Sequence, residues 1–134
     1  MRRVVITGIG IVSSIGSNAE EVKKSLFDCT PGISKAIGYD NLGFKSQVYG
    51  SPNIDLEENI DRKKLRFLAD GSAWAFIAAE QAITDAELDE SDVSNERTGL
   101  IVGTGGPSTR AIVKAADQTR DKGAKHVGPF VVPK

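Results

Sequence analysis

Residues 4–16 read VVITGIGIVSSIG, a β-branched run that meets two glycines separated by one residue. A strand that enters the phosphate loop of a dinucleotide-binding domain looks similar, but its full signature is G-x-G-x-x-G. Here Ser13 stands at the third glycine position, and residues 34–36, where a ribose-binding acid is expected, carry none. We therefore predict a buried strand over about 3–12 whose glycines permit close backbone packing, with a nucleotide-binding domain as the weaker alternative.

Composition limits the classes of protein to which the chain can belong. With 134 residues, 40% of them hydrophobic and 26% charged, the chain is long enough for one modest domain with a core. The net charge of -1 gives no overall attraction to nucleic acid, and no apolar run is long enough to insert into a membrane. A single cysteine, Cys29, excludes an internal disulfide and favours a reducing compartment, so the cytoplasm is the expected location.

The order of helix and strand signals predicts an α/β fold. Asn18 and Glu21 form a capping-box pattern at the start of a short helix, and Asp61 is placed to cap the longest one. The other expected elements are an irregular stretch over 30–60 with β-like pieces such as 44–49, a largely buried helix over 62–86, an acidic loop over 85–96, a buried strand over 99–103, a helix near 108–120 and an extended apolar end over 127–134.

The chain holds few residues suited to covalent or metal chemistry. Cys29 lies beside Asp28, whose charge disfavours a thiolate, and His126 has no acidic neighbour in sequence to orient it. One cysteine and one histidine do not make a zinc site of a common type, and no P-loop pattern occurs. We therefore expect no catalytic residue, no metal and no cofactor site within these residues.

A cluster of cations marks the start of the predicted long helix. The helix macrodipole disfavours positive charge there, so the cluster needs another reason to exist. Two interpretations remain open from the residues alone: a solvated face, or a docking surface for an acidic partner. The cluster comprises Arg62, Lys63, Lys64 and Arg66, and a second group follows at Arg120, Lys122 and Lys125.

Several blocks, in order along the whole chain, resemble the beginning of the bacterial β-ketoacyl-acyl-carrier-protein synthases, the type I enzymes above all. The blocks are VVITGIGIVSSIG (4–16), IDRKKLRF (60–67), EQAITDA (80–86), GLIVGTGG (99–106) and VGPFVVPK (127–134).

The resemblance implies the N-terminal portion of the first half of a thiolase-like fold with αβαβα layers, and residues 1–134 as one incomplete segment of that domain. It further implies a homodimer that works in fatty acid biosynthesis without a metal or redox cofactor. Such enzymes condense an acyl thioester held on a cysteine with malonyl-acyl carrier protein, and two histidines assist. Neither Cys29 nor His126 matches those residues, so we expect the 134-residue chain to be a fragment that is inactive alone.

The resemblance also assigns roles to individual positions. It implies that Arg62, Lys63 and Arg66, with Lys122 and Lys125, dock acyl carrier protein, and that Gly105, Gly106 and Phe130 lie near the acyl tunnel or the dimer contact. It thereby favours the docking interpretation of the cation cluster over a solvated face. A non-catalytic module that binds carrier protein remains an alternative, because it would carry the same basic residues.

Overall fold

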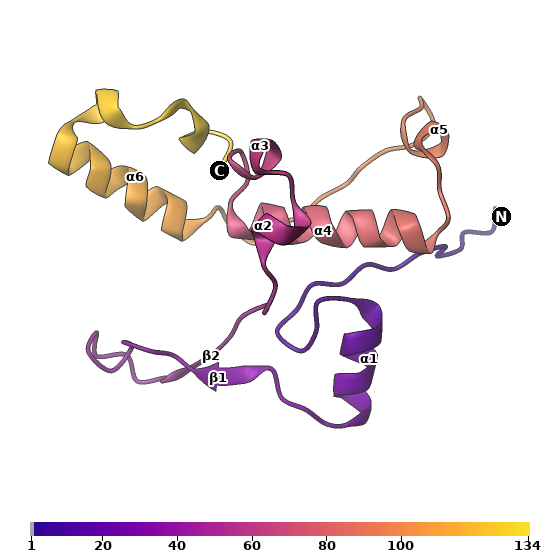
Figure 1. The fold of residues 1–134 in the computed structure, drawn as a ribbon, viewed down its shortest axis with the longest axis horizontal. Helices are drawn as coiled ribbons and strands as arrows, with labels where there is room; N and C mark the ends of the chain where they lie inside the picture. The colour runs from indigo at the N-terminus through magenta and orange to yellow at the C-terminus, as the bar shows by residue number, and fades with distance from the viewer. Residues whose placement is uncertain (1) are drawn as a thin grey trace. The chain divides into compact units, whose positions relative to one another are not determined.

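The computed structural model describes residues 2–134, which form two compact units (Figure 1). The first unit comprises residues 2–54 and 78–87, and the second comprises residues 55–77 and 88–134. Helix α4, Asp70–Asp85, contributes its first half to the second unit and its second half to the first unit.

The first unit contains α1, Ala19–Phe27, and a small antiparallel sheet. Asn18 caps α1 as predicted, because its Oδ1 accepts a hydrogen bond from the Glu21 amide at 2.9 Å. Glu21 Oε2 in turn accepts a hydrogen bond from the Ser17 amide at 2.8 Å, one residue before the position that a standard capping box uses. The sheet pairs β1, Ile33–Lys35, with β2, Val48–Gly50, so the irregular stretch does contain strands, but they overlap the expected piece 44–49 only in part.

The strand expected over 3–12 is not formed. Its backbone runs beside the second half of α4, and the amide of Ile9 donates to Asp85 Oδ2 at 2.9 Å. The amide of Ile11 likewise donates to Gln81 Oε1 at 3.0 Å. Side chains of α4 therefore accept hydrogen bonds that the carbonyls of a neighbouring strand would accept in a sheet. Val4 is 90% exposed, whereas the sequence predicts that it is buried.

The glycines of this segment serve the close packing that the sequence predicted. A Cβ built on Gly10 would lie 1.8 Å from the carbonyl oxygen of Ala78, and one on Gly8 would lie 2.3 Å from that of Ala82. Backbone of α4 thus fills the space in front of the glycines. This contact explains the G-x-G pattern without a nucleotide.

The second unit is mostly helical. Its elements are α2 (Leu56–Asn59), α3 (Arg62–Leu65), the first half of α4, α5 (Glu90–Val93), α6 (Thr109–Lys122), and the 3₁₀ turns η1 (Ala124–His126) and η2 (Pro129–Val131). Its buried apolar residues are Ile60, Ala69, Ala73 and Ile77. The helix expected near 108–120 is confirmed as α6, which Ser108 caps through the Ala111 amide.

Three expectations for residues 62–96, which span parts of both units, are wrong. The single helix over 62–86 is two helices, because residues 67 and 68 form tight turns to the carbonyls of Lys64 and Leu65 before α4 starts. Within α4 only Ala73 and Ile77 are buried, so the helix is not largely buried. The expected acidic loop contains α5, which Asp89 caps.

The two apolar segments expected to be extended or buried also differ. Residues 99–103 form no strand, and Ile101 is 97% exposed, since an apolar run predicts a strand without supplying its partner. The end of the chain turns at η2 instead of remaining extended, and Pro129 at its first position supplies a φ suited to such a turn.

Candidate functional site: a basic surface and an adjacent hollow

The first cation group lies on α3 and just after it, in the second unit. Asp61 is a helix cap, but it caps the four-residue α3 and not, as expected, the longest helix, α4: its Oδ1 accepts a hydrogen bond from the Lys63 amide at 2.7 Å. Arg62, Lys63 and Arg66 are exposed, and across residues 2–134 no ion pair involves any of them. Their charges are therefore open to a partner.

The break between α3 and α4 changes the electrostatic argument about this group. The macrodipole of the 16-residue helix α4 starts at Asp70, an acid, which is the favourable charge at that end. The cations belong to a four-residue helix with little dipole of its own. The expected penalty against them is thus largely absent, and their presence no longer needs a compensating cause.

Two cations of this group lie over aromatic rings. Lys64 Nζ is 5.1 Å from the ring centre of Phe76. The guanidinium carbon of Arg66 is 4.9 Å from the ring centre of Phe67 and 4.9 Å from that of Phe130, and these two rings meet edge to face at 4.8 Å. Contacts of this kind orient a cation while leaving its N–H groups free to bind an anion.

The second cation group lies at the end of α6. Arg120 is bound to Asp117 of the same helix at 2.8 Å, whereas Lys122 and Lys125 are exposed and make no ion pair in the described chain. Gln118 Nε2 donates to the carbonyl of His126 at 2.7 Å and so ties η1 back to α6. Lys122 and Lys125 are therefore presented by a turn that is anchored at both ends.

The structure links the two groups through the end of the chain. After η1, the segment drawn in yellow returns alongside α6 toward α3 (Figure 1), where Phe130 meets Phe67. Both groups belong to the second unit. We call the five exposed cations the basic surface: Arg62, Lys63, Arg66, Lys122 and Lys125.

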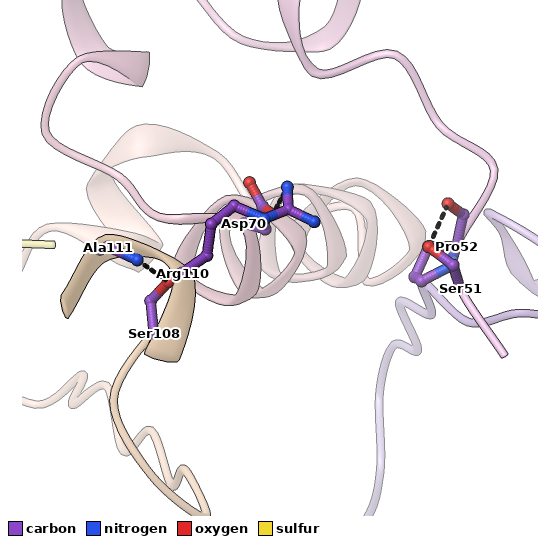
Figure 2. Close-up of polar contacts among 6 residues, drawn as sticks. All are labelled: Ser51, Pro52, Asp70, Ser108, Arg110 and Ala111. Atoms are coloured by element: carbon purple, nitrogen blue, oxygen red, sulfur yellow. Dashed lines mark hydrogen bonds and ion pairs between the residues drawn. The ribbon is translucent and has the colours of Figure 1, made fainter. Parts of the chain in front are cut away.

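A hollow of about 550 Å³ lies between the start of α4, residues 102–109 and the start of α6. Trp74 and Val102 supply apolar lining, and Gly106 lies at its wall, whereas Gly105 and Phe130 do not line it. At its edge Arg110 and Asp70 form an ion pair at 2.8 Å (Figure 2). Figure 2 also draws the Ser108 cap of α6 and the contact from the Ser51 hydroxyl to the Pro52 carbonyl in the first unit.

Sequence reasoning did not find the Asp70–Arg110 pair or the ring of Phe67. The two ionic partners are 40 residues apart, and no local pattern connects them. Phe67 directly follows Arg66, so its aromatic type is visible in the sequence, but its contact with Phe130 depends on the path of the chain end. Each of these contacts needs the fold to be known first.

The described residues offer little for bond-breaking chemistry. Cys29 is exposed at the end of α1, and its Sγ makes a long contact of 4.0 Å to the carbonyl of Leu26. His126 is exposed in η1, and neither residue lines the hollow. Across residues 2–134 no three His, Cys, Asp or Glu side chains gather in a way that could hold a metal ion. In the same range, every helix is too short or too polar to cross a bilayer.

Comparisons with known proteins identify the class. The family described as "Beta-ketoacyl synthase, N-terminal domain" matches residues 1–133, so the chain belongs to the β-ketoacyl synthase family. A solved structure, the ishigamide ketosynthase/chain length factor, superposes with a TM-score of 0.84 at 27% identity over 99% of this chain and 34% of its own. This likeness bears out the expected thiolase-like α/β fold.

Among individual relatives, 3-oxoacyl-[acyl-carrier-protein] synthase 1 of Escherichia coli K12 is 48% identical over the whole chain and 34% of its own length. The protein of the same name from Haemophilus influenzae is 44% identical over the whole chain and 33% of its length. The synthase 2 of Staphylococcus aureus N315 is 33% identical over 98% of the chain and 32% of its length. The chain thus spans about a third of the length of these curated relatives.

Proposed function

We propose that the chain supplies the N-terminal part of a β-ketoacyl-acyl-carrier-protein synthase that works in fatty acid biosynthesis. The observation that carries this proposal is the 48% identity with the E. coli synthase 1 over the whole chain. The proposed reaction is the condensation of an acyl thioester with malonyl-acyl carrier protein, with loss of carbon dioxide. The proposed setting is a homodimer in the cytoplasm.

Within that reaction, residues 1–134 form one segment of the condensing domain and contribute no catalytic side chain. The hollow beside α4 supports a role for Gly106 near the acyl chain or the subunit contact, since Gly106 lies at its wall. We extend the same proposal to Gly105, which directly precedes Gly106 in the sequence, and to Phe130, whose ring lies against Arg66 of the basic surface.

The basic surface is the proposed docking site for acyl carrier protein. Five exposed cations without ionic partners among residues 2–134 suit an acidic partner, whose approach they would steer. The names of the E. coli and H. influenzae relatives include acyl carrier protein, which supports this choice of partner.

The test of docking is charge reversal in the intact protein. We expect Arg62→Glu with Arg66→Glu to weaken binding of acyl carrier protein about tenfold or more at low salt, and less as salt rises and screens both charges. Lys45→Glu is the matched control, because Lys45 is also exposed and has no ion pair in the described chain but belongs to the first unit. Equal affinity for the double variant and the original protein at low salt would exclude this surface as the docking site.

The test of the catalytic proposal is a chimaera in which this chain replaces the matched third of the E. coli synthase. We expect the chimaera to condense an acyl thioester with malonyl-acyl carrier protein, and the 134-residue chain alone to give no turnover. A folded chimaera that binds carrier protein without condensing would support the alternative of a non-catalytic binding module. Turnover by the 134-residue chain alone would contradict the assignment of chemistry to residues outside it.

A further inference from the structure

The position of Arg66 depends on an aromatic ring contributed from 64 residues further along the chain. The side chain of Arg66 leaves the end of α3, where the backbone is in the right-handed helical region at φ -60° and ψ -21°. Its guanidinium carbon lies 4.9 Å from both the Phe67 ring and the Phe130 ring. Phe67 is adjacent in sequence and always near, so Phe130 is the part of this arrangement that the fold must deliver.

We propose that Phe130 is a positioning residue for the basic surface: its ring holds the Arg66 guanidinium in the orientation that receives an acidic partner. This inference rests on the proposed docking function. Phe130 itself carries no charge and makes no contact that a carboxylate partner would use. It acts through Arg66.

The geometry gives the ring two separate effects on Arg66. First, cation–π attraction limits the rotamers of a long side chain that would otherwise be ordered only on binding. Second, the edge-to-face contact of Phe130 with Phe67, at 4.8 Å, fixes the two rings relative to each other and so fixes the site between them. Stacking uses the face of the guanidinium, so its N–H groups remain available for paired hydrogen bonds to a carboxylate.

The same contact couples the two cation groups. Phe130 belongs to η2, which follows η1 and Lys125 in the chain segment that Gln118 ties to α6. The ring therefore joins that segment to the end of α3. A partner that binds both groups meets them in an arrangement which is set before binding.

The experiment compares Phe130→Leu with Phe130→Tyr in the intact protein, with acyl carrier protein as the probe. Leu keeps an apolar side chain but removes the ring, whereas Tyr keeps the ring. We expect Phe130→Leu to weaken binding roughly twofold to fivefold at low salt, and Phe130→Tyr to bind as the original does. Phe44→Leu is the matched control, since Phe44 is an exposed aromatic residue of the first unit.

Two further readouts separate positioning from a structural role. The side-chain protons of Arg66 should carry an upfield ring-current shift in the original protein that decreases in Phe130→Leu. In a background of Arg66→Glu, Phe130→Leu should have no further effect on binding, because the cation through which it acts is gone. Phe130→Met, another apolar residue without a ring, repeats the test if Phe130→Leu lowers the amount of folded protein.

The outcomes distinguish this inference from the docking proposal. If Arg66→Glu weakens binding but Phe130→Leu and Phe130→Met do not, docking stands and the positioning role of Phe130 is wrong. If Phe130→Leu weakens binding equally with and without Arg66→Glu, the ring acts independently of the cation, and the inference is overturned. If Arg62→Glu with Arg66→Glu has no effect, the docking proposal itself fails.

Discussion

Within each of the two units, a different kind of contact joins segments that are distant in sequence. In the first unit, backbone approaches backbone: Gly8 and Gly10 lie directly against α4, whose Gln81 and Asp85 accept hydrogen bonds from neighbouring amides. In the second unit, exposed side chains pair across the surface, as in the ion pair of Asp70 with Arg110. Close backbone contact tolerates almost no added atom, whereas exposed pairs tolerate exchange, so the difference predicts where substitutions will be severe.

The largest effect is expected where the backbones meet. Gly10→Ala places a methyl group 1.8 Å from the Ala78 carbonyl, so one backbone must move away. We expect the free energy of unfolding to fall by about 3 kcal/mol, measured by urea denaturation. Gly105→Ala is the control, since its added Cβ meets nothing within 4 Å and should change stability by less than about 0.5 kcal/mol. Similar values for both variants would show that close approach does not govern the first unit.

A smaller effect is expected from the hydrogen bonds that accompany this approach. Gln81 accepts from the Ile11 amide at 3.0 Å and donates to the Ser17 carbonyl at 2.7 Å, both partly buried. Gln81→Ala leaves those two groups without partners, which should cost about 2 kcal/mol in the same urea experiment. Glu80→Ala changes an exposed neighbour on the same helix and should be nearly neutral. A neutral Gln81→Ala would mean that water replaces both bonds.

The ion pair of the second unit should contribute less. The Arg110 side chain is 83% exposed and that of Asp70 is 41% exposed, so solvent screens their attraction. In a double-mutant cycle with Arg110→Gln and Asp70→Asn, we expect a coupling energy below about 1 kcal/mol that disappears at high salt. A coupling as large as the Gln81 effect would remove the contrast between the two units.

The smallest effect concerns Asp89, which caps α5 in the second unit. The Ser91 hydroxyl, followed by the amides of Asp92 and Ser91, holds the pKa of the Asp89 carboxyl below its ordinary value of 3.8. Because the pKa of Asp89 is lower in the folded chain than in the unfolded chain, its carboxylate stabilises α5 at every pH above the unfolded-state pKa. This stabilisation is lost as the pH falls through the folded-state pKa. An NMR titration should show the Ser91 and Asp92 amide signals moving together below that value. In Asp89→Asn this movement should be absent, and its persistence would assign it to another group.

The sequence predicts helix starts in both units but not the contacts between distant segments. Asn18 caps its helix as expected, and Asp61 caps a helix at the expected residue, because a cap depends on residues within one turn; the helix that Asp61 starts is α3 and not the longest one. The strands over 3–12 and 99–103 were wrong, since a strand requires a partner that local periodicity does not identify. The break of the long helix at residues 66–69 was also missed, because no glycine or proline marks it.

The candidate site divides in the same way. The cations of the basic surface are visible in the sequence, because charge is a property of each residue alone. Their assignment to carrier-protein docking came from resemblance to a family and stays a prediction. The ring of Phe130 over Arg66 joins residues 64 positions apart, so only the folded chain brings it to the site.

Where residues 8–11 contact α4, every second residue of the segment faces every fourth residue of the helix. Two residues of extended chain advance roughly 6.6 Å, and four residues of helix advance about 6 Å. Gly8 therefore meets Ala82 and Ala86 while Gly10 meets Ala78 and Ala82, and the amides of Ile9 and Ile11 reach Asp85 and Gln81 with the same offset. The advance of two residues of the segment nearly equals the advance of four residues of the helix, so glycines and helix backbone stay in step over this contact. Shifting residues 8–11 by one position along α4 would place an isoleucine where the helix backbone leaves room only for glycine, so the alternation of glycine and isoleucine fixes the alignment of this long-range contact.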